Sequence, residues 1–220
     1  GGSGVGSGAS PSISSLSDGE LSLIKVSALK AGGTFGEVLD EQSRKIIEQI
    51  EKNVLSVPEK ANGERMEWSD IAGMKRAKEQ YQKIAKKFAD PNAKGRLGAG
   101  KLHILYGPGG TGKSLIARTL ASQLGCSYLP LNKSNIQSSF VGEGTKYVSG
   151  YFHVAKKVQP TVIFFDECDD VLNPTADKHN VDLINRFKDG IDPGLKGHRV
   201  IIICATNHPW KIEDAFLTRA

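Results

Sequence analysis

The sequence GPGGTGKS, at positions 107–114, holds four glycines and ends in a lysine and a serine hydroxyl. Glycine lets backbone N–H groups approach a ligand closely, and the N-terminus of a following helix favours an anion. The spacing G-x-x-x-x-G-K-S is typical of a phosphate-binding loop, in which Lys113 reaches the terminal phosphates and Ser114 reaches Mg²⁺. A glycine-rich turn that binds nothing is the alternative. The residues predicted to contact nucleotide here are Pro108, Gly109, Gly110, Thr111, Gly112, Lys113, Ser114 and Leu115.

The residues on both sides of this loop agree with that prediction. The apolar run LHILY at 102–106 is suited to a buried parallel strand. After the loop, apolar residues recur at helical spacing, and Gly125 follows as a helix stop. A strand, a glycine loop and a helix in this order are the context that a phosphate-binding loop requires.

A pair of carboxylates supplies the second half of the expected site. In the sequence TVIFFDECDD, Asp166 and Glu167 directly follow an apolar run at 162–165. The carboxyl ends of strands are where open α/β sheets bind ligands, so Asp166 is predicted to join the magnesium shell. Glu167 is placed to act as the base for an attacking water. A single acidic residue would favour a helix cap, but the adjacent pair favours catalysis.

A third strand end carries an uncharged amide. Asn207 follows the apolar run at 200–204 and could hydrogen-bond a γ-phosphate or the attacking water; a turn residue is the alternative. The sequence NKSN at 132–135 is similar to the guanine-reading N-K-x-D motif, but its fourth residue is Asn135 and it comes too early in the chain. Adenine is therefore the predicted base, and the predicted ligands are ATP and Mg²⁺.

These residues must be positioned by a sheet. Strands expected at 102–106, 127–131, 162–165 and 200–204 alternate with helical patterns, which predicts an α/β fold with a parallel, doubly wound sheet and helices on both faces. Residues 1–19 are rich in Gly and Ser and predict a flexible tail. We assign 20–64 to a linker with an amphipathic helix and 65–220 to the domain. The apolar positions expected on one face of that helix are Leu39, Ile46, Ile50 and Val54.

Composition narrows the class of protein. The 220 residues are 39% hydrophobic and 24% charged, which is typical of a globular domain. No apolar run approaches the roughly 20 residues of a membrane span, and three scattered cysteines favour a reducing compartment, so we expect a cytoplasmic protein, with the nucleus as the alternative. The net charge of +5 includes a basic helix at 74–88. We interpret it as a solvated face rather than as a nucleic-acid site.

Together with WSDIAG, SFVGEG and ATNHPW, these motifs resemble the AAA+ ATPases of the meiotic clade: katanin, spastin, fidgetin-like proteins and the ESCRT-disassembling ATPases. The likeness covers about residues 38–219 and leans toward the fidgetin-like branch. It implies a P-loop NTPase fold, with Phe140 and Val141 in a pore loop that grips a polypeptide and Arg219 reaching a neighbouring subunit. It further implies an adenine pocket lined by Asp70, Ile71, Ala72 and Gly73.

The resemblance implies a hexameric enzyme that hydrolyses ATP to pull on a polypeptide, with tubulin tails as the leading substrate. Disassembly of ESCRT or other filaments is one alternative. A nucleotide-binding adaptor without hydrolysis is another, because Thr218 stands where relatives carry the first of two arginines. A metabolic kinase would need arginines in a closing lid, and the sequence has no such cluster. The chain also stops before the last strand and the helical lid domain of the family, so we expect a truncated part of a longer protein.

Overall fold

The computed structural model of the chain describes residues 40–89, 101–137 and 143–218. The chain divides into a unit of residues Gly1–Asp40 and a unit of residues Glu41–Ala220, and every element described below belongs to the second.

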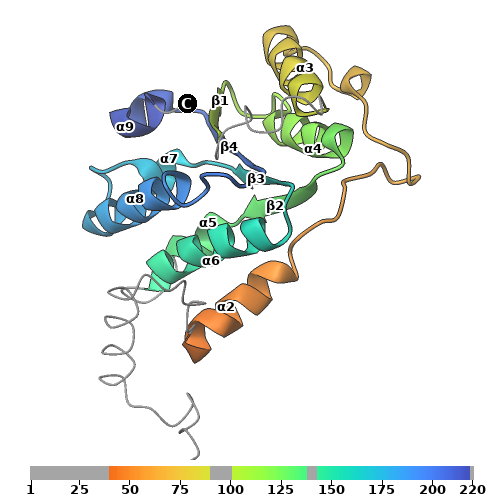
Figure 1. Cartoon of the computed structure of the whole chain (residues 1–220). Helices are drawn as coiled ribbons and strands as arrows, with labels where there is room; N and C mark the ends of the chain where they lie inside the picture. Colours follow the sequence, from red (N-terminus) through yellow and green to blue (C-terminus); the bar gives the residue numbers. More distant parts are fainter. Residues whose placement is uncertain (1–39, 90–100, 138–142, 219–220) are drawn as a thin grey trace, which may run out of the picture. The chain divides into compact units, whose positions relative to one another are not determined.

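The second unit is built on four parallel strands, as the sequence predicts (Figure 1). They are β1 (Lys101–Tyr106), β2 (Ser127–Leu131), β3 (Thr161–Phe165) and β4 (Val200–Thr206), in the order β1-β4-β3-β2. The predicted range of β2 is confirmed in full. β4 runs two residues beyond its predicted end and stops at Thr206, directly before Asn207. The strand order therefore sets the carboxyl ends of β1, β4 and β3 side by side.

Helices cover both faces of the sheet. One face carries α3 (Lys75–Ala89) and α4 (Lys113–Leu124), and the other carries α6 (Glu143–Lys157) and α8 (Lys178–Ile191) (Figure 1). Successive side chains of a strand point to opposite faces, so Phe164 packs in the core beneath α4, whereas Phe165 stacks on Phe187 of α8 at 5.4 Å between ring centres. The short helices are η2 (Trp68–Asp70), α5 (Lys133–Gln137), α7 (Asp169–Leu172), η4 (Pro209–Lys211) and α9 (Asp214–Leu217).

The predicted amphipathic helix is α2 (Glu41–Glu51), and it packs on α6. It buries Ile46 and Ile50 as expected, and also Ile47, which the sequence pattern did not single out. Val54 lies beyond the end of α2 and is half-buried, and Leu39 lies outside the described residues. Gly150 of α6 permits the close approach, because a Cβ there would lie 2.9 Å from the Ile50 Cδ1 atom. After the helix, Leu55 pairs with Tyr128 of β2 through two backbone hydrogen bonds of 2.9 and 2.8 Å.

Helix α8 also approaches α6 at a glycine, and this contact predicts a stability effect. A Cβ at position 190 would lie 2.4 Å from ring atoms of Phe152. Alanine in a helix gains about 1 kcal/mol over glycine, but overpacking a core costs about 1–3 kcal/mol, and an aromatic ring yields little. We expect Gly190→Ala to lower the free energy of unfolding, as measured by urea denaturation. Asn185→Ala, an exposed control on the same helix, should change it by less than about 0.5 kcal/mol. A stabilised Gly190→Ala variant would contradict this packing.

Candidate nucleotide-binding site

The predicted phosphate loop connects β1 to α4, in the strand–loop–helix context expected from the sequence. Gly110 and Gly112 have φ values of +73° and +89°, a backbone region in which other residues are strained. Gly112 directly precedes α4, and the Thr111 hydroxyl donates to the Pro108 carbonyl at 2.9 Å. Backbone N–H groups in such a loop and at a helix N-terminus form a concavity suited to phosphate.

Lys113 is the first residue of α4, at the end of this loop, and is only 8% exposed. Its Nζ donates to the carbonyls of Gly107 and Pro108, at 3.0 and 2.9 Å, and to Asn207 Oδ1 at 2.9 Å. A lysine ammonium has three protons, so all three are engaged by these acceptors. A phosphate oxygen that binds at Nζ must therefore replace one of them.

The lysine contact shows where the structure places Asn207. The residue directly follows β4, which lies between β1 and β3. Its amide reaches the phosphate loop on two sides: Oδ1 accepts from Lys113, and Nδ2 lies 3.6 Å from where a Cβ of Gly109 would stand. Two sequence-predicted site residues 94 positions apart are thus in direct contact.

Asp166 and Glu167 directly follow β3, and both side chains are exposed. Glu167 has a φ of +49°, which is uncommon for a residue with a side chain, and its N–H donates to Asp166 Oδ1 at 2.9 Å. Unusual backbone conformations of this kind gather at functional sites. The turn therefore presents two carboxylates at the same edge of the sheet as the phosphate loop.

The residues predicted to hold Mg²⁺ fit that ion. Ser114 exposes its hydroxyl in the first turn of α4, and Asp166 supplies a carboxylate. Mg²⁺ prefers oxygen ligands and is commonly held by one or two protein groups together with substrate phosphates and water. Among the described residues no three His, Cys, Asp or Glu side chains gather in a way that could hold a metal ion.

A hydrogen-bond network around a buried carboxylate, next to Asn207 in the chain, was not predicted from the sequence. Asp169 is 5% exposed, and its Oδ1 accepts from the Thr206 hydroxyl at 2.6 Å. His208 Nδ1 lies 3.2 Å from Asp169 Oδ2, and the His208 N–H donates to the Thr206 hydroxyl at 2.8 Å. Asn207 lies between two anchored residues, so the network fixes the end of β4 against α7. The third acidic residue of DECDD was the available sequence signal.

Lys133 was considered in the sequence only as part of NKSN, and the structure gives it a different place. It begins α5, just after β2, and its Nζ bonds both Glu167 Oε2 and Asp170 Oδ2. The hydrogen bonds that Lys133 donates, first to Asp170 and then to Glu167, raise the pKa of Lys133. A lysine therefore joins the predicted base to a second carboxylate.

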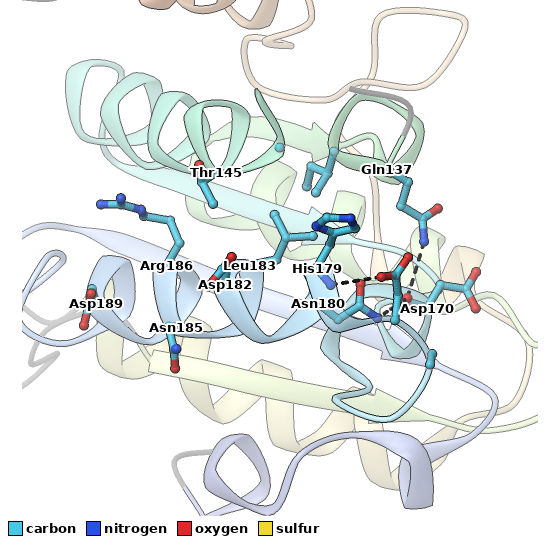
Figure 2. A pocket seen from close by; sticks show the side chains of 14 residues that line it. Gln137, Thr145, Asp170, His179, Asn180, Asp182, Leu183, Asn185, Arg186 and Asp189 are labelled. Carbon is cyan, nitrogen blue, oxygen red and sulfur yellow. Dashed lines mark hydrogen bonds between the residues drawn. The ribbon is translucent and has the colours of Figure 1, made fainter. Parts of the chain in front are cut away.

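Asp170 also faces a hollow of about 720 Å³ between α5, α6 and α8 (Figure 2). The backbone carbonyl of Asp170 accepts from Gln137 Nε2 and Asn180 Nδ2, at 3.3 and 3.2 Å. The main chain of Asp170 is thus held from two other helices, independently of its carboxylate.

Of the residues expected to line the adenine pocket, Asp70 ends η2, and Ile71, Ala72 and Gly73 lie between η2 and α3. Asp70 accepts from the Glu67 N–H at 2.8 Å and pairs with Lys60 at 3.0 Å, and these contacts, in that order, lower its pKa. Ile71 is 3% exposed and packs in the same core cluster as Tyr81, whereas Ala72 and Gly73 are exposed. Contact of this segment with a base stays a prediction. Phe140, Val141 and Arg219 lie outside the described residues.

Comparison with known proteins shows the family of this chain. Residues 103–220 match the family model described as the ATPase family associated with various cellular activities (AAA). Spastin of Drosophila virilis is 31% identical over 229 residues, which cover 99% of this chain and 26% of the relative. Spastin of Drosophila mojavensis is 32% identical over 169 residues, covering 71% and 22%. The chain thus spans about a quarter of the length of these curated relatives.

Solved protein structures are also similar to this chain. The crystal structure of the FIGL-1 AAA domain is 32% identical, with a TM-score of 0.67 over 83% of this chain and 59% of that chain. The ADP complex of that domain is 31% identical, with a TM-score of 0.65 over 83% and 61%. A structure described as "Structural Basis for Katanin Self-Assembly", at 23% identity and a TM-score of 0.58 over 85% and 59%, shares the fold. No helix within the described ranges has the length and apolarity to cross a bilayer. With its phosphate loop, its parallel sheet and these matches, the chain belongs to the AAA family of ATPases.

Proposed function

We propose that the chain binds ATP with Mg²⁺ and hydrolyses it as part of a ring-forming enzyme that remodels a polypeptide. The main support for a nucleotide site is that Lys113 contacts both the phosphate loop and Asn207. This contact lies at the edge of the sheet where Asp166 and Glu167 follow β3. The ADP complex of the FIGL-1 AAA domain, which is 31% identical, supports the ligand class.

Each residue has a defined task in this proposal. The loop N–H groups and Lys113 bind the phosphates, and Lys113 gives up an acceptor of its own to do so. Asn207 orients the attacking water or the γ-phosphate, and Glu167 takes the proton from that water. Ser114 and Asp166 hold Mg²⁺, which supplies neutralisation of the charge that develops on the phosphates. Ile71 and its neighbours Asp70, Ala72 and Gly73 contact adenine.

The proposals of a polypeptide substrate and of a ring rest on the relatives of this chain. Spastins are among its relatives in sequence, and the description of the katanin structure refers to self-assembly. We propose a hexamer in which Arg219 reaches the nucleotide of a neighbour and Phe140 and Val141 grip the substrate. Microtubule severing through tubulin tails is the proposed activity, in the cytoplasm. Disassembly of other filaments would use the same residues, and a non-hydrolysing adaptor would not need Glu167.

The proposed polypeptide grip predicts a separation of two activities. We expect Phe140→Ala to bind ATP as the wild type does but to lose work on the substrate, because the residue lies outside the phosphate-binding loop in sequence. The measurements are fluorescent-nucleotide affinity and the cutting of labelled microtubules by microscopy, with Phe216→Leu as the control for a conservative change in the core, where Phe216 is 1% exposed. Loss of cooperative melting in Phe140→Ala would place Phe140 in the core instead. Severing at the wild-type rate would exclude Phe140 from contact with the polypeptide substrate.

A further inference from the structure

Thr206, Asp169 and His208 form a closed ring of hydrogen bonds beside Asn207. The Thr206 hydroxyl donates to Asp169 Oδ1 at 2.6 Å, and the His208 N–H donates to the Thr206 hydroxyl at 2.8 Å. His208 Nδ1 lies 3.2 Å from Asp169 Oδ2 and closes the ring. The Asp169 side chain is 6% exposed, whereas that of His208 is 44% exposed. Both oxygens of a buried carboxylate are therefore engaged, and the histidine is the member that reaches the surface.

This ring determines where its protons lie. The Thr206 hydroxyl accepts from the backbone of His208, and its own proton points to Asp169. An ionised carboxylate only accepts hydrogen bonds, so the second contact of Asp169 requires a proton on His208 Nδ1. A neutral histidine carries one ring proton, and the hydrogen bond of one nitrogen sets the role of the other. Neutral His208 is therefore the Nδ1–H tautomer.

Asp169 is a firm point of attachment for His208. It begins α7, and the N–H of the preceding residue, Cys168, donates to the Ala205 carbonyl of β4 at 3.1 Å. The ring of Trp210 stands edge-on to that of His208, at 5.3 Å between ring centres, and packs against it. The imidazole thus joins the chain that leaves β4 to a helix that is itself tied to β4.

Asn207 lies between two residues of this ring. On one side, Thr206 is the last residue of β4. On the other side, the contact of His208 with the carboxylate holds the chain where it leaves the sheet. The Asn207 amide accepts from Lys113 Nζ at 2.9 Å. A shift of His208 would therefore move this amide relative to the phosphate loop.

We propose that His208 is a positioning residue that holds the Asn207 amide at the phosphate loop, through the proton on Nδ1 and the carboxylate of Asp169. The inference rests on the proposed function, because that function assigns Asn207 to the attacking water or the γ-phosphate. In this role His208 acts through Asn207 and not on a ligand. The placement matters for the rate, because a displacement of about 1 Å from the productive geometry can cost about 100-fold.

The first test determines the tautomer of His208 in the 220-residue chain by long-range proton–nitrogen NMR, at about pH 9, where imidazole is neutral. Histidine in water favours Nε2–H, so a proton on Nδ1 of His208 is a specific expectation. His198 is the internal control, because its Nδ1 lies 3.2 Å from Gln159 Nε2, which can only donate. Gln159 Oε1 accepts from the Arg199 N–H at 2.8 Å, which fixes the orientation of that amide. We expect Nε2–H at His198, and Nε2–H at His208 would overturn the proposal.

The second test separates the rate of hydrolysis from nucleotide binding, with protein in excess over labelled ATP and Mg²⁺. His208→Leu removes the donor and should lower the rate about 10-fold, while the affinity for a non-hydrolysable ATP analogue stays within about twofold. His208→Asn should keep the wild-type rate, because asparagine Nδ2, like histidine Nδ1, is bonded to Cγ and donates. His198→Leu, before the start of β4, is the matched control and should leave the rate unchanged. Equal losses in His208→Leu and His208→Asn would overturn the proposal.

A third readout needs no hydrolysis. With the analogue bound, the side-chain amide signals of Asn207 should shift in His208→Leu and keep their wild-type positions in His208→Asn. Cooperative melting of each variant shows that it is folded at the temperature of the spectra. Unchanged Asn207 signals in folded His208→Leu would overturn the positioning, whatever the rate of hydrolysis.

The two proposals fail in different ways. Should Asn207→Ala hydrolyse ATP as fast as the wild type, the role of Asn207 in the proposed function is wrong whatever His208 does. If instead Asn207→Ala is slow and His208→Leu is as fast as the wild type, only the positioning by His208 is wrong. A loss of analogue affinity in His208→Leu as large as the loss of rate would show support of the whole site, and it would also overturn the positioning of Asn207.

Discussion

Lys113→Ala should weaken ATP binding by roughly 10- to 100-fold or more, the scale of one or two charge-assisted hydrogen bonds. Lys113 supplies the positive charge at the end of the phosphate loop, and its Nζ already lies within 3.0 Å of two loop carbonyls and of Asn207. Alanine removes the charge that the β- and γ-phosphates would meet. It also leaves three oxygen atoms without the donor that now joins them. Fluorescent-nucleotide titration measures the effect.

Two controls separate a lost contact from a lost fold. Lys157→Ala removes a cation from α6 and should leave the dissociation constant unchanged. The melting temperature of Lys113→Ala should show that the variant is folded at the temperature of the titration. An unaltered dissociation constant in a folded Lys113→Ala protein would exclude this loop as the phosphate site.

Glu167→Gln should retain ATP binding and lower turnover by about 100-fold or more, the scale of a lost general base. The amide is close in size to the carboxylate but cannot take a proton from water. The backbone of Glu167 is already in place at the end of β3, so the substitution changes the chemistry at the tip of the side chain and little else. Phosphate release at saturating ATP and nucleotide affinity are the paired measurements.

Asp170→Asn is the matched control for this prediction, because Asp170 bonds the same lysine as Glu167. Its carboxylate is removed, while its main chain keeps the hydrogen bonds from Gln137 and Asn180. Turnover in Asp170→Asn should stay within a few-fold of the wild type. Equal losses in the two variants would indicate that the acidic cluster acts by its total charge and not through Glu167.

The chemistry-bearing residues could be predicted because each lies in a short, continuous segment next to a strong strand pattern. The loop at 107–114 and the acidic pair at 166–167 are read directly from neighbouring residues. The parallel sheet followed from four apolar runs separated by helices, and the structure confirms it. These segments meet because of the order of the strands in the sheet. The sequence indicates which strands exist, but it does not show which of them are neighbours.

The contacts that could not be predicted join residues far apart in the chain. Lys133 and Glu167 are 34 positions apart, and Asp169 and Thr206 are 37 apart. Neither pair has a local pattern, because each depends on which strand ends are adjacent. Ile47 was missed for a related reason: Gly150 lets α2 approach α6 closely, so the buried stripe of α2 is wider than its own periodicity indicates.

The pairing of Leu55 with Tyr128 also bears on how the outer strand of the sheet is protected. β2 is the last strand in the sheet order, and an uncovered outer strand offers backbone groups that can recruit strands from other molecules. Leu55 occupies those groups at Tyr128, and α2 covers an apolar face of α6 beside it. A chain cut to begin at Glu59 would keep all four strands yet uncover both surfaces. Residues 41–57, which look like a simple lead-in to the domain, therefore protect the β2 edge from pairing with strands of other molecules.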